Sequence, residues 1–344
     1  MSGNNESLKK FLENRSPIRY IFTGGKGGVG KTISAAGIAA YFALKGEKVL
    51  LASLNPVHSL SSLFNQDLSG GVIKPVEGIE NLWAIEVDIT EKVMRYKKQL
   101  SERLRWFLKW ADIPVKADEF VDIAATNPAF EESAMFDETV DIMLEKGSEF
   151  DRIIFDTAAV ANAVRLLGLN KIYGLWLERM IESRKEALSL RVKLSFRKEK
   201  VMEEIKKDPM MKDLLELNEK IRKATEIFGD PNKTVFFFVT LPLALPIAVV
   251  KRFIKMVEGF NIPTGGVIVN SVLTKKTLEL GEATDYLKNK LVEQERYLEI
   301  IKRDLWPQVR TVIPLYPREI IGVESVIKLS EDMFNWEPSM GFYQ

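Results

Sequence analysis

The sequence predicts an α/β fold in which a parallel β-sheet is covered by helices on both faces. Two observations support this prediction. Short, continuous apolar segments rich in β-branched and aromatic residues recur along the chain, and helical segments separate them. Strands buried on both faces are apolar at nearly every position, which is the pattern seen here. The segments expected to form strands are Arg19–Thr23, Glu47–Ser53, Leu82–Val87, Asp151–Phe155, Thr234–Thr240, Gly266–Asn270 and Val309–Pro314.

The first of these segments opens a strand–loop–helix–strand unit. Arg19–Thr23 runs into a glycine-rich loop, and the small residues of Lys31–Leu44 then form a helix. Gly46 closes that helix, and Glu47–Ser53 is the second strand. A unit of this kind places its two strands parallel, with a right-handed crossover between them.

The length of the chain predicts more than a single compact sheet domain. A chain of 344 residues is long for one hydrophobic core, so we expect a domain with insertions. Residues 1–17 are polar and are expected to form a flexible lead-in to a domain that spans residues 18–344. Residues 89–149 and 171–230 are long, charged and without a strand pattern. We expect these two stretches to be helical insertions that form a subdomain beside the sheet.

Composition excludes several classes of function. The net charge is +1, which argues against a nucleic-acid partner. The chain has no cysteine and only one histidine, His58, so disulfides, cysteine nucleophiles and cysteine- or histidine-based zinc sites are excluded. No apolar run is long enough to span a bilayer, and the N-terminus does not read as a signal peptide. The expected location is cytoplasmic, with membrane contact that is at most transient.

The glycine-rich loop after the first strand matches the phosphate-binding motif G-x-x-x-x-G-K-[ST]. It consists of Gly25, Lys26, Gly27, Gly28, Val29, Gly30, Lys31 and Thr32, between a predicted strand and a predicted helix. The glycines let backbone N–H groups point at phosphate oxygens, and the helix N-terminus adds a positive dipole end. Lys31 is expected to reach the β- and γ-phosphates, and the Thr32 hydroxyl to coordinate Mg²⁺. The predicted ligand is therefore a Mg-nucleoside triphosphate bound by a P-loop; the family resemblance given below implies ATP.

The second residue of the loop, Lys26, distinguishes this loop from a plain phosphate-binding loop. The run K-G-G-V-G-K-T resembles the deviant loop of the ParA/MinD, nitrogenase-iron-protein and ArsA group of ATPases. In that group the extra lysine crosses a homodimer interface to the partner's phosphates, where it stabilises transition-state charge. A solvated loop cation is the alternative role for Lys26.

Five further segments resemble the ArsA family, which includes the ATPase that targets tail-anchored membrane proteins. Leu54–Phe64 resembles the family's switch I, and Phe155–Leu167 resembles its switch II. Three later segments also resemble the family: Val239–Phe253, Gly259–Asn270 and Ile313–Val326. Because these matches occur in order from about residue 18 to 330, we identify the chain as a member of the ArsA family, and a prokaryotic one without cysteine.

The resemblance implies roles for individual residues. Asp156 would orient Mg²⁺ through water, although a helix N-cap is the alternative. Asn270 would read the adenine edge, with a turn asparagine as the alternative, while Pro314 and Leu315 would pack near the ring. His58 would either help switch I sense the γ-phosphate or be structural. The predicted nucleotide-binding set is Gly25, Lys26, Gly27, Gly28, Val29, Gly30, Lys31, Thr32, Ile33, Asn270, Pro314 and Leu315.

The chain departs from the family at a catalytic position. Asn55 stands where switch I of the family has the aspartate that polarises the attacking water. An amide has nearly the same shape but cannot take a proton, so ATP should bind and be hydrolysed slowly. Asn55 is either an engineered trap or natural divergence. Switch II residues 159–162 and the family's glutamate positions at Leu243 and Val249 also differ, which favours divergence.

The family's C-x-x-C pair is also absent, so a homodimer would lack its zinc. Cysteine sites for arsenite are missing too, which makes an arsenite pump an unlikely function.

The second insertion contains a group of apolar residues that two interpretations explain. In the targeting ATPase, insertions at these places form a methionine-rich groove that shields a client's hydrophobic transmembrane segment. The residues that would line such a groove here are Trp176, Leu177, Met180, Phe196, Met202, Met210 and Met211. The alternative is that they form the subdomain's own core, since apolar stripes at helical spacing usually do.

Three functions are consistent with these features. The favoured one is a dimeric, ATP-switched factor that targets or shields hydrophobic segments. The second is an ATP-bound regulatory scaffold that no longer cycles, and the third is a positioning ATPase of the ParA/MinD kind.

Overall fold

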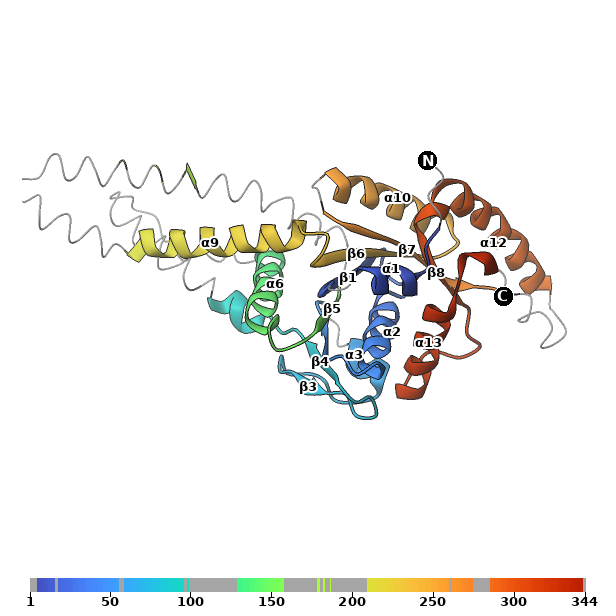
Figure 1. Cartoon of the computed structure of the whole chain (residues 1–344), viewed down its shortest axis with the longest axis horizontal. Coiled ribbons are helices and arrows are strands. Elements are labelled where there is room, and N and C mark those ends of the chain that lie inside the picture. The colour runs from blue at the N-terminus through green and yellow to red at the C-terminus, as the bar shows by residue number, and fades with distance from the viewer. Residues whose placement is uncertain are drawn as a thin grey trace, which may run out of the picture.

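The computed structural model describes residues 5–15, 18–55, 59–95, 98, 129–157, 178–179, 182, 186, 209–259, 262–274 and 285–342. Within these residues, eight strands form one sheet in the order β3-β4-β2-β5-β1-β6-β7-β8 (Figure 1). Every neighbouring pair is parallel except β3 and β4. The strands are β1 (Tyr20–Gly25), β2 (Val49–Ser53), β3 (Lys74–Pro75), β4 (Leu82–Glu86), β5 (Arg152–Asp156), β6 (Thr234–Thr240), β7 (Thr264–Val272) and β8 (Val309–Pro314). The predicted α/β class is confirmed.

Two sets of helices cover the two faces of this sheet, each with its own hydrophobic core. The first face packs against α1 (Leu8–Asn14), α2 (Lys31–Leu44), α3 (Ser59–Phe64) and α13 (Val323–Asn335). The second packs against α6 (Ala129–Asp141), α9 (Pro209–Gly229), α10 (Ala244–Gly259) and α12 (Asp285–Asp304). A π-helical turn, Ile142–Lys146, extends α6, and short 3₁₀ turns lie at Trp306–Gln308 and Pro338–Met340.

Successive side chains of each strand alternate between these two cores. In β1, Phe22 lies on the second face, where its ring stacks on Phe155 and Phe236 at 4.5 Å between centroids. Its neighbour Ile21 points to the first face and packs in the core around α2. Because a strand has a period of two residues, the residues that end each strand also have a defined face.

Each predicted strand is present, with ends shifted by at most a few residues. The strand that the sequence did not predict is β3, whose two residues pair antiparallel with β4. So short a strand carries no apolar run, and a proline such as Pro75 is tolerated only at an edge or strand end.

Residues 5–15 differ from the expected flexible lead-in. They include α1, in which Leu8, Phe11 and Leu12 are buried against the first face. The ring of Phe11 meets Phe237 edge-on at 5.6 Å. The polar composition concealed an i, i+3, i+4 spacing of apolar residues, which is the pattern of an amphipathic helix. The folded domain therefore begins before residue 18.

Charged side chains join the two segments expected to be insertions. Lys92, from the first segment, lies 2.7 Å from Glu138 and 2.6 Å from Asp141 of α6. Lys220 of α9, from the second segment, lies 2.6 Å from Asp141. Figure 1 shows α9 projecting beyond the edge of the sheet. The bounds of the insertions stay a prediction, because much of both segments lies outside the described residues. Every helix in the described ranges is too short or too polar to cross a membrane.

Replacing Phe11 with alanine tests whether α1 belongs to the folded domain. The side chain is 4% exposed, so we expect Phe11→Ala to lower the free energy of unfolding by about 3 kcal/mol, as measured by urea denaturation. Lys10→Ala is the control on the same helix, because its ion pair with Glu337 is exposed and should contribute less than about 1 kcal/mol. Equal stability of the two variants would contradict the packing of α1.

Candidate nucleotide site

The predicted P-loop connects β1 to α2 at the carboxyl end of the parallel strands, where ligands bind in open α/β sheets. Gly28 and Gly30 have φ values of 77° and 93°, a region that favours glycine. Gly30 caps α2 in this left-handed conformation. The loop backbone therefore turns back over the positive end of α2, as a phosphate cradle requires.

Close packing fixes the loop from two neighbouring strands. A β-carbon on Gly25 would lie 2.5 Å from the Val239 carbonyl oxygen of β6, and one on Gly30 would collide with the Asn270 amide of β7. The buried Asn270 donates from Nδ2 to the Val29 carbonyl at 2.9 Å, and its Oδ1 accepts from the Ser271 N–H at 2.8 Å. Asn270 thus holds the loop in place, a role that the sequence did not predict.

The two lysines of the loop have opposite exposures. Lys31 is 8% exposed and its Nζ donates to the Lys26 carbonyl at 3.3 Å. Burial lowers the pKa of Lys31, and the charge of Asp156 acts against that shift. The side chain of Lys26 is exposed at the loop surface. Lys31 therefore faces the inside of the cradle, while Lys26 is accessible from outside it.

Asp156 and Thr32 meet beneath the loop. The Thr32 hydroxyl donates to Asp156 Oδ2 at 2.6 Å, and Asp156 is fully buried at the end of β5. Burial raises the pKa of Asp156 to about 6, although the Thr32 hydroxyl, the Lys31 charge and the Ser53 hydroxyl all lower it. The other carboxylate oxygen, Oδ1, is buried without a hydrogen-bond partner in the described part of the chain.

These groups fit a magnesium ion. Mg²⁺ prefers oxygen ligands and is usually held by one or two carboxylates together with substrate phosphates. The Thr32 hydroxyl and the unpaired Oδ1 of Asp156 supply such oxygens beside the phosphate loop. Elsewhere in the described ranges, no three His, Cys, Asp or Glu side chains gather into a possible metal site.

Buried polar residues that the sequence did not identify as functional lie level with Asp156 on the neighbouring strands. Ser53 of β2 is the register partner of both Asp156 and Glu86 of β4, and Thr23 of β1 is the partner of Asp156 on its other side. Ser53, Thr23 and Glu86 are all buried. For Ser53 and Glu86 the available signal was a polar residue at the carboxyl end of an apolar strand, the same signal that identified Asp156.

Asn55 lies two residues beyond β2 and is partly buried. Its backbone N–H donates to the Ser53 hydroxyl at 3.3 Å. Ser53 in turn donates to Asp156 Oδ2 across 3.5 Å, so the Asn55 position is connected to the carboxylate beneath the P-loop. His58 lies outside the described residues.

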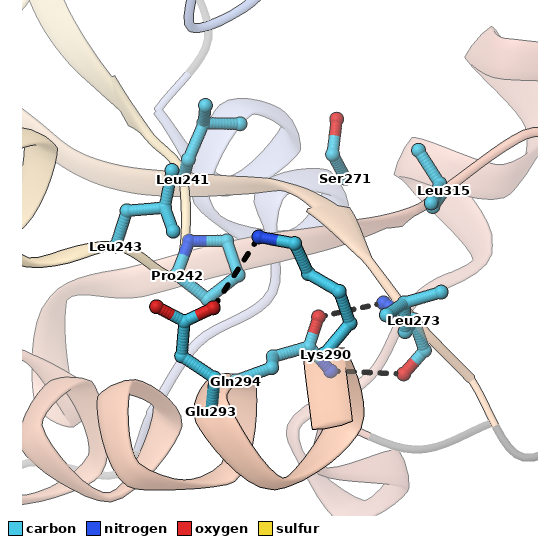
Figure 2. Close-up of a pocket in the computed structure, with 9 residues that line it drawn as sticks. All are labelled: Leu241, Pro242, Leu243, Ser271, Leu273, Lys290, Glu293, Gln294 and Leu315. Atoms are coloured by element: carbon cyan, nitrogen blue, oxygen red, sulfur yellow. Dashed lines mark hydrogen bonds and ion pairs between the residues drawn. The ribbon is translucent and has the colours of Figure 1, made fainter. Parts of the chain in front are cut away.

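A small apolar pocket is lined by two residues that adjoin predicted base-binding positions, Ser271 after Asn270 and Leu315 after Pro314. It has a volume of about 180 Å³ and is formed at the ends of β6, β7 and β8 and by α12 (Figure 2). Its lining residues are Leu241, Pro242, Leu243, Ser271, Leu273, Lys290, Glu293, Gln294 and Leu315. Leu315 is thus part of the pocket, and Pro314 is the register partner of Val272 in β7.

The structure does not test the residues predicted to line a client groove, because most of them lie outside the described part of the chain. Trp176, Leu177, Met180, Phe196 and Met202 lie outside the described residues. Met210 and Met211 are in the first turn of α9, but their side chains are outside the description. The groove therefore stays a prediction.

Comparison with known proteins agrees with this site. The family model of the anion-transporting ATPases, ArsA ATPases, matches residues 18–335. The chain belongs to this family. Membership of a family of ATPases, with relatives such as ATPase GET3C, confirms the prediction of an ATP-hydrolysing P-loop enzyme.

Several relatives match over nearly the whole chain. ATPase GET3C of Arabidopsis thaliana is 32% identical, with 90% of this chain and 80% of the relative covered. The putative arsenical pump-driving ATPase 2 of Aquifex aeolicus (strain VF5) is 28% identical, with 91% and 98% covered. ATPase ASNA1 homolog 2 of Paramecium tetraurelia is 28% identical, with 94% and 96% covered.

Asp156 predicts a pH-dependent stability. Its pKa of about 6 exceeds the ordinary 3.8, so the folded state binds the proton more tightly than the unfolded state does. The preference of the folded state for protonated Asp156 stabilises the protein fully below pH 3.8, and this stabilisation is lost as the pH rises through 6. At pH 8 the folded protein therefore buries a charged carboxylate, whereas asparagine stays neutral. Asp156→Asn should therefore stabilise the nucleotide-free protein at pH 8 by on the order of 2–3 kcal/mol.

Denaturant unfolding at several pH values measures this gain, which should shrink as the pH falls from 8 toward 4. Asp285→Asn is the control, because its side chain is 96% exposed and the change should have little effect at any pH. A destabilised Asp156→Asn protein at pH 8 would contradict the cost assigned to the buried charge.

Proposed function

We propose that this chain is a homodimeric, ATP-switched ATPase of the cytoplasm that targets or shields hydrophobic transmembrane segments of client proteins. The observation that carries the proposal is the Thr32–Asp156 pair beneath a left-handed glycine loop. The resemblance to the tail-anchored-protein-targeting branch, and relatives such as ATPase GET3C, support the targeting role.

The loop residues bind ATP through its phosphates. Backbone N–H groups of the glycine loop and the N-terminus of α2 donate to the phosphate oxygens, and the Lys31 ammonium balances their charge. Burial of Lys31 makes its interaction with a phosphate stronger than it would be in water. The base would lie against Asn270, Pro314 and Leu315, and Leu315 also lines the apolar pocket of Figure 2.

Thr32 and Asp156 would hold Mg²⁺, with the Thr32 hydroxyl as a ligand and Asp156 acting through water. The ion would supply positive charge against the negative charge that develops on the phosphates. Asp156 accepts hydrogen bonds from Thr32 and Ser53 on one oxygen, which leaves the other free to orient a water molecule.

The exposed lysine supports a homodimer. Lys26 is exposed, so its side chain is available to the nucleotide of a second copy. Exposed leucines gather near the same edge of the sheet, with Leu243 at 36% exposure and Leu315 at 42%. A second copy packed over this edge would cover them and place Lys26 at its partner's phosphates. The dimer would form without the family's zinc, because the chain has no cysteine.

Slow hydrolysis follows from Asn55. The amide can orient a water molecule but cannot accept its proton, and loss of a positioned base costs about 10²–10⁴ in rate. The donors that bind ATP are separate from this residue, so affinity should be retained. A non-cycling, ATP-bound scaffold is the second candidate function, and Asn55 is the observation that favours it.

Restoring the carboxylate distinguishes these two candidates. We expect Asn55→Asp to raise the single-turnover hydrolysis rate by at least about tenfold while the Mg-ATP dissociation constant stays within about threefold. Asn335→Asp, an exposed change at the end of α13, should alter neither quantity. An Asn55→Asp protein that binds Mg-ATP but turns over no faster would favour the scaffold. Absence of calorimetric Mg-ATP binding by the wild-type chain would refute the whole proposal.

The targeting role predicts ATP-dependent capture of an apolar helix. A tail-anchored substrate co-expressed with the chain should co-purify with it in Mg-ATP, and Lys31→Ala should abolish the capture by removing nucleotide binding. A Met210→Asp, Met211→Asp double variant should reduce capture severalfold if these residues line the groove. Val72→Asp is the matched control, because Val72 is 54% exposed but belongs to the sheet domain. If capture changes neither with Mg-ATP nor in the Met210→Asp, Met211→Asp variant, the targeting role would be contradicted.

A further inference from the structure

Glu86 is a buried carboxylate that the nucleotide chemistry does not use. It ends β4 and is 3% exposed. Its Oε1 accepts the backbone N–H groups of Leu60 and Ser61, each at 2.8 Å, and its Oε2 accepts the Ser61 hydroxyl at 2.8 Å. Three donors from the first turn of α3 therefore converge on one side chain of the sheet.

α3 depends on this anchor for its position. It has only six residues, Ser59–Phe64, and a helix of that length is unstable by itself. Its apolar residues Leu60, Leu63 and Phe64 pack on the first face of the sheet. Glu86 adds polar contacts that fix where the helix begins, because its three hydrogen bonds have normal lengths and the carboxylate itself is buried.

The first residue of α3 continues this network toward the nucleotide site. The hydroxyl of Ser59 lies 3.3 Å from the hydroxyl of Ser53. Ser53 donates to Asp156, so its hydroxyl must accept from Ser59 and from the Asn55 N–H. A hydroxyl has one proton and two lone pairs, and this assignment uses all three. The direction of the bonds thus runs from Ser59 through Ser53 to Asp156.

The strand register explains why the network is continuous. Glu86, Ser53 and Asp156 are paired across β4, β2 and β5, and all three point to the face that carries α2 and α3. Glu86 is held by three bonds of 2.8 Å, whereas the contacts of Ser53 measure 3.3–3.5 Å. The network is therefore firm at Glu86 and looser at Ser53, beside the phosphate site.

We propose that Glu86 is a positioning residue for ATP hydrolysis: by fixing Ser59 at the start of α3, it holds Ser53 and the backbone at Asn55 in place beside the Mg-ATP site. This inference rests on the proposed function, because it assumes that Asn55 occupies the position of the water-orienting residue. Glu86 is separated from Ser53 by the first turn of α3, so it acts by positioning other residues and does not contact the substrate itself.

Site-resolved hydrogen exchange of the full-length chain tests the coupling directly. Glu86→Ala should speed exchange of the Leu60 and Ser61 amides, its direct partners, and also of the Asn55 amide, each by about tenfold or more. The single-turnover rate should fall about tenfold while calorimetric Mg-ATP affinity changes less than about threefold. Glu86→Gln should restore most of both properties, because its amide oxygen accepts two N–H groups and its nitrogen donates to Ser61. Glu80→Ala, at an exposed residue before β4, is the control.

Ser59→Ala separates the two halves of the network. It should speed exchange at Asn55 and leave the Leu60 amide protected, and it serves as the test if Glu86→Ala does not fold by circular dichroism. Faster exchange confined to Leu60 and Ser61, with unchanged hydrolysis, would overturn the proposal and make Glu86 a helix cap only. So would a Ser59→Ala protein with unchanged exchange at Asn55. Lack of Mg-ATP binding by the wild-type chain would instead refute the proposed function, since the exchange measurements need no nucleotide.

Discussion

The hydrogen bond between Thr32 and Asp156 is the interaction on which the site depends. It joins the first turn of α2 to the end of β5, 124 residues further along the chain, and it holds a carboxylate that has no exposed surface. Burying such a charge is costly unless other groups compensate it. Here Thr32, Lys31 and Ser53 lower the pKa of Asp156, but burial still outweighs them. The nucleotide-free site therefore retains an unfavourable charge that a bound cation would relieve.

The parallel register turns this local pair into an extended site. Because β4, β2, β5 and β1 are paired at matching levels, Glu86, Ser53 and Asp156 end their strands in one row, and Thr23 of β1 lies level with them. Each side chain of the row faces α2 or α3, because strands alternate faces every two residues. The fold thereby brings polar groups from distant segments together beneath the P-loop without any extra motif in the sequence.

Functional residues could be predicted from the sequence where they form a contiguous motif or where a polar residue directly follows an apolar strand. The P-loop is contiguous, and Asp156 follows an apolar run, so both could be predicted. The bond from Asn270 to Val29 joins residues 241 positions apart, and no local pattern reports such a contact. α1 was missed because its three buried residues are surrounded by polar ones, so that composition masked the helical spacing. Ser53 and Glu86 were missed because small or charged residues at strand ends are common on surfaces.

The contact made by Asn55 shows how binding and hydrolysis can separate in this chain. Its bond to Ser53 uses the backbone N–H, which is the same whether the side chain is an acid or an amide. Exchanging one for the other leaves that link to Asp156 and α3 in place and changes the charge available to a water molecule. On the proposal that Asn55 orients the attacking water, this chain would lack the catalytic carboxylate and keep the backbone and strand-end contacts around it. The binding of the nucleotide and the rate of its hydrolysis would then depend on different atoms.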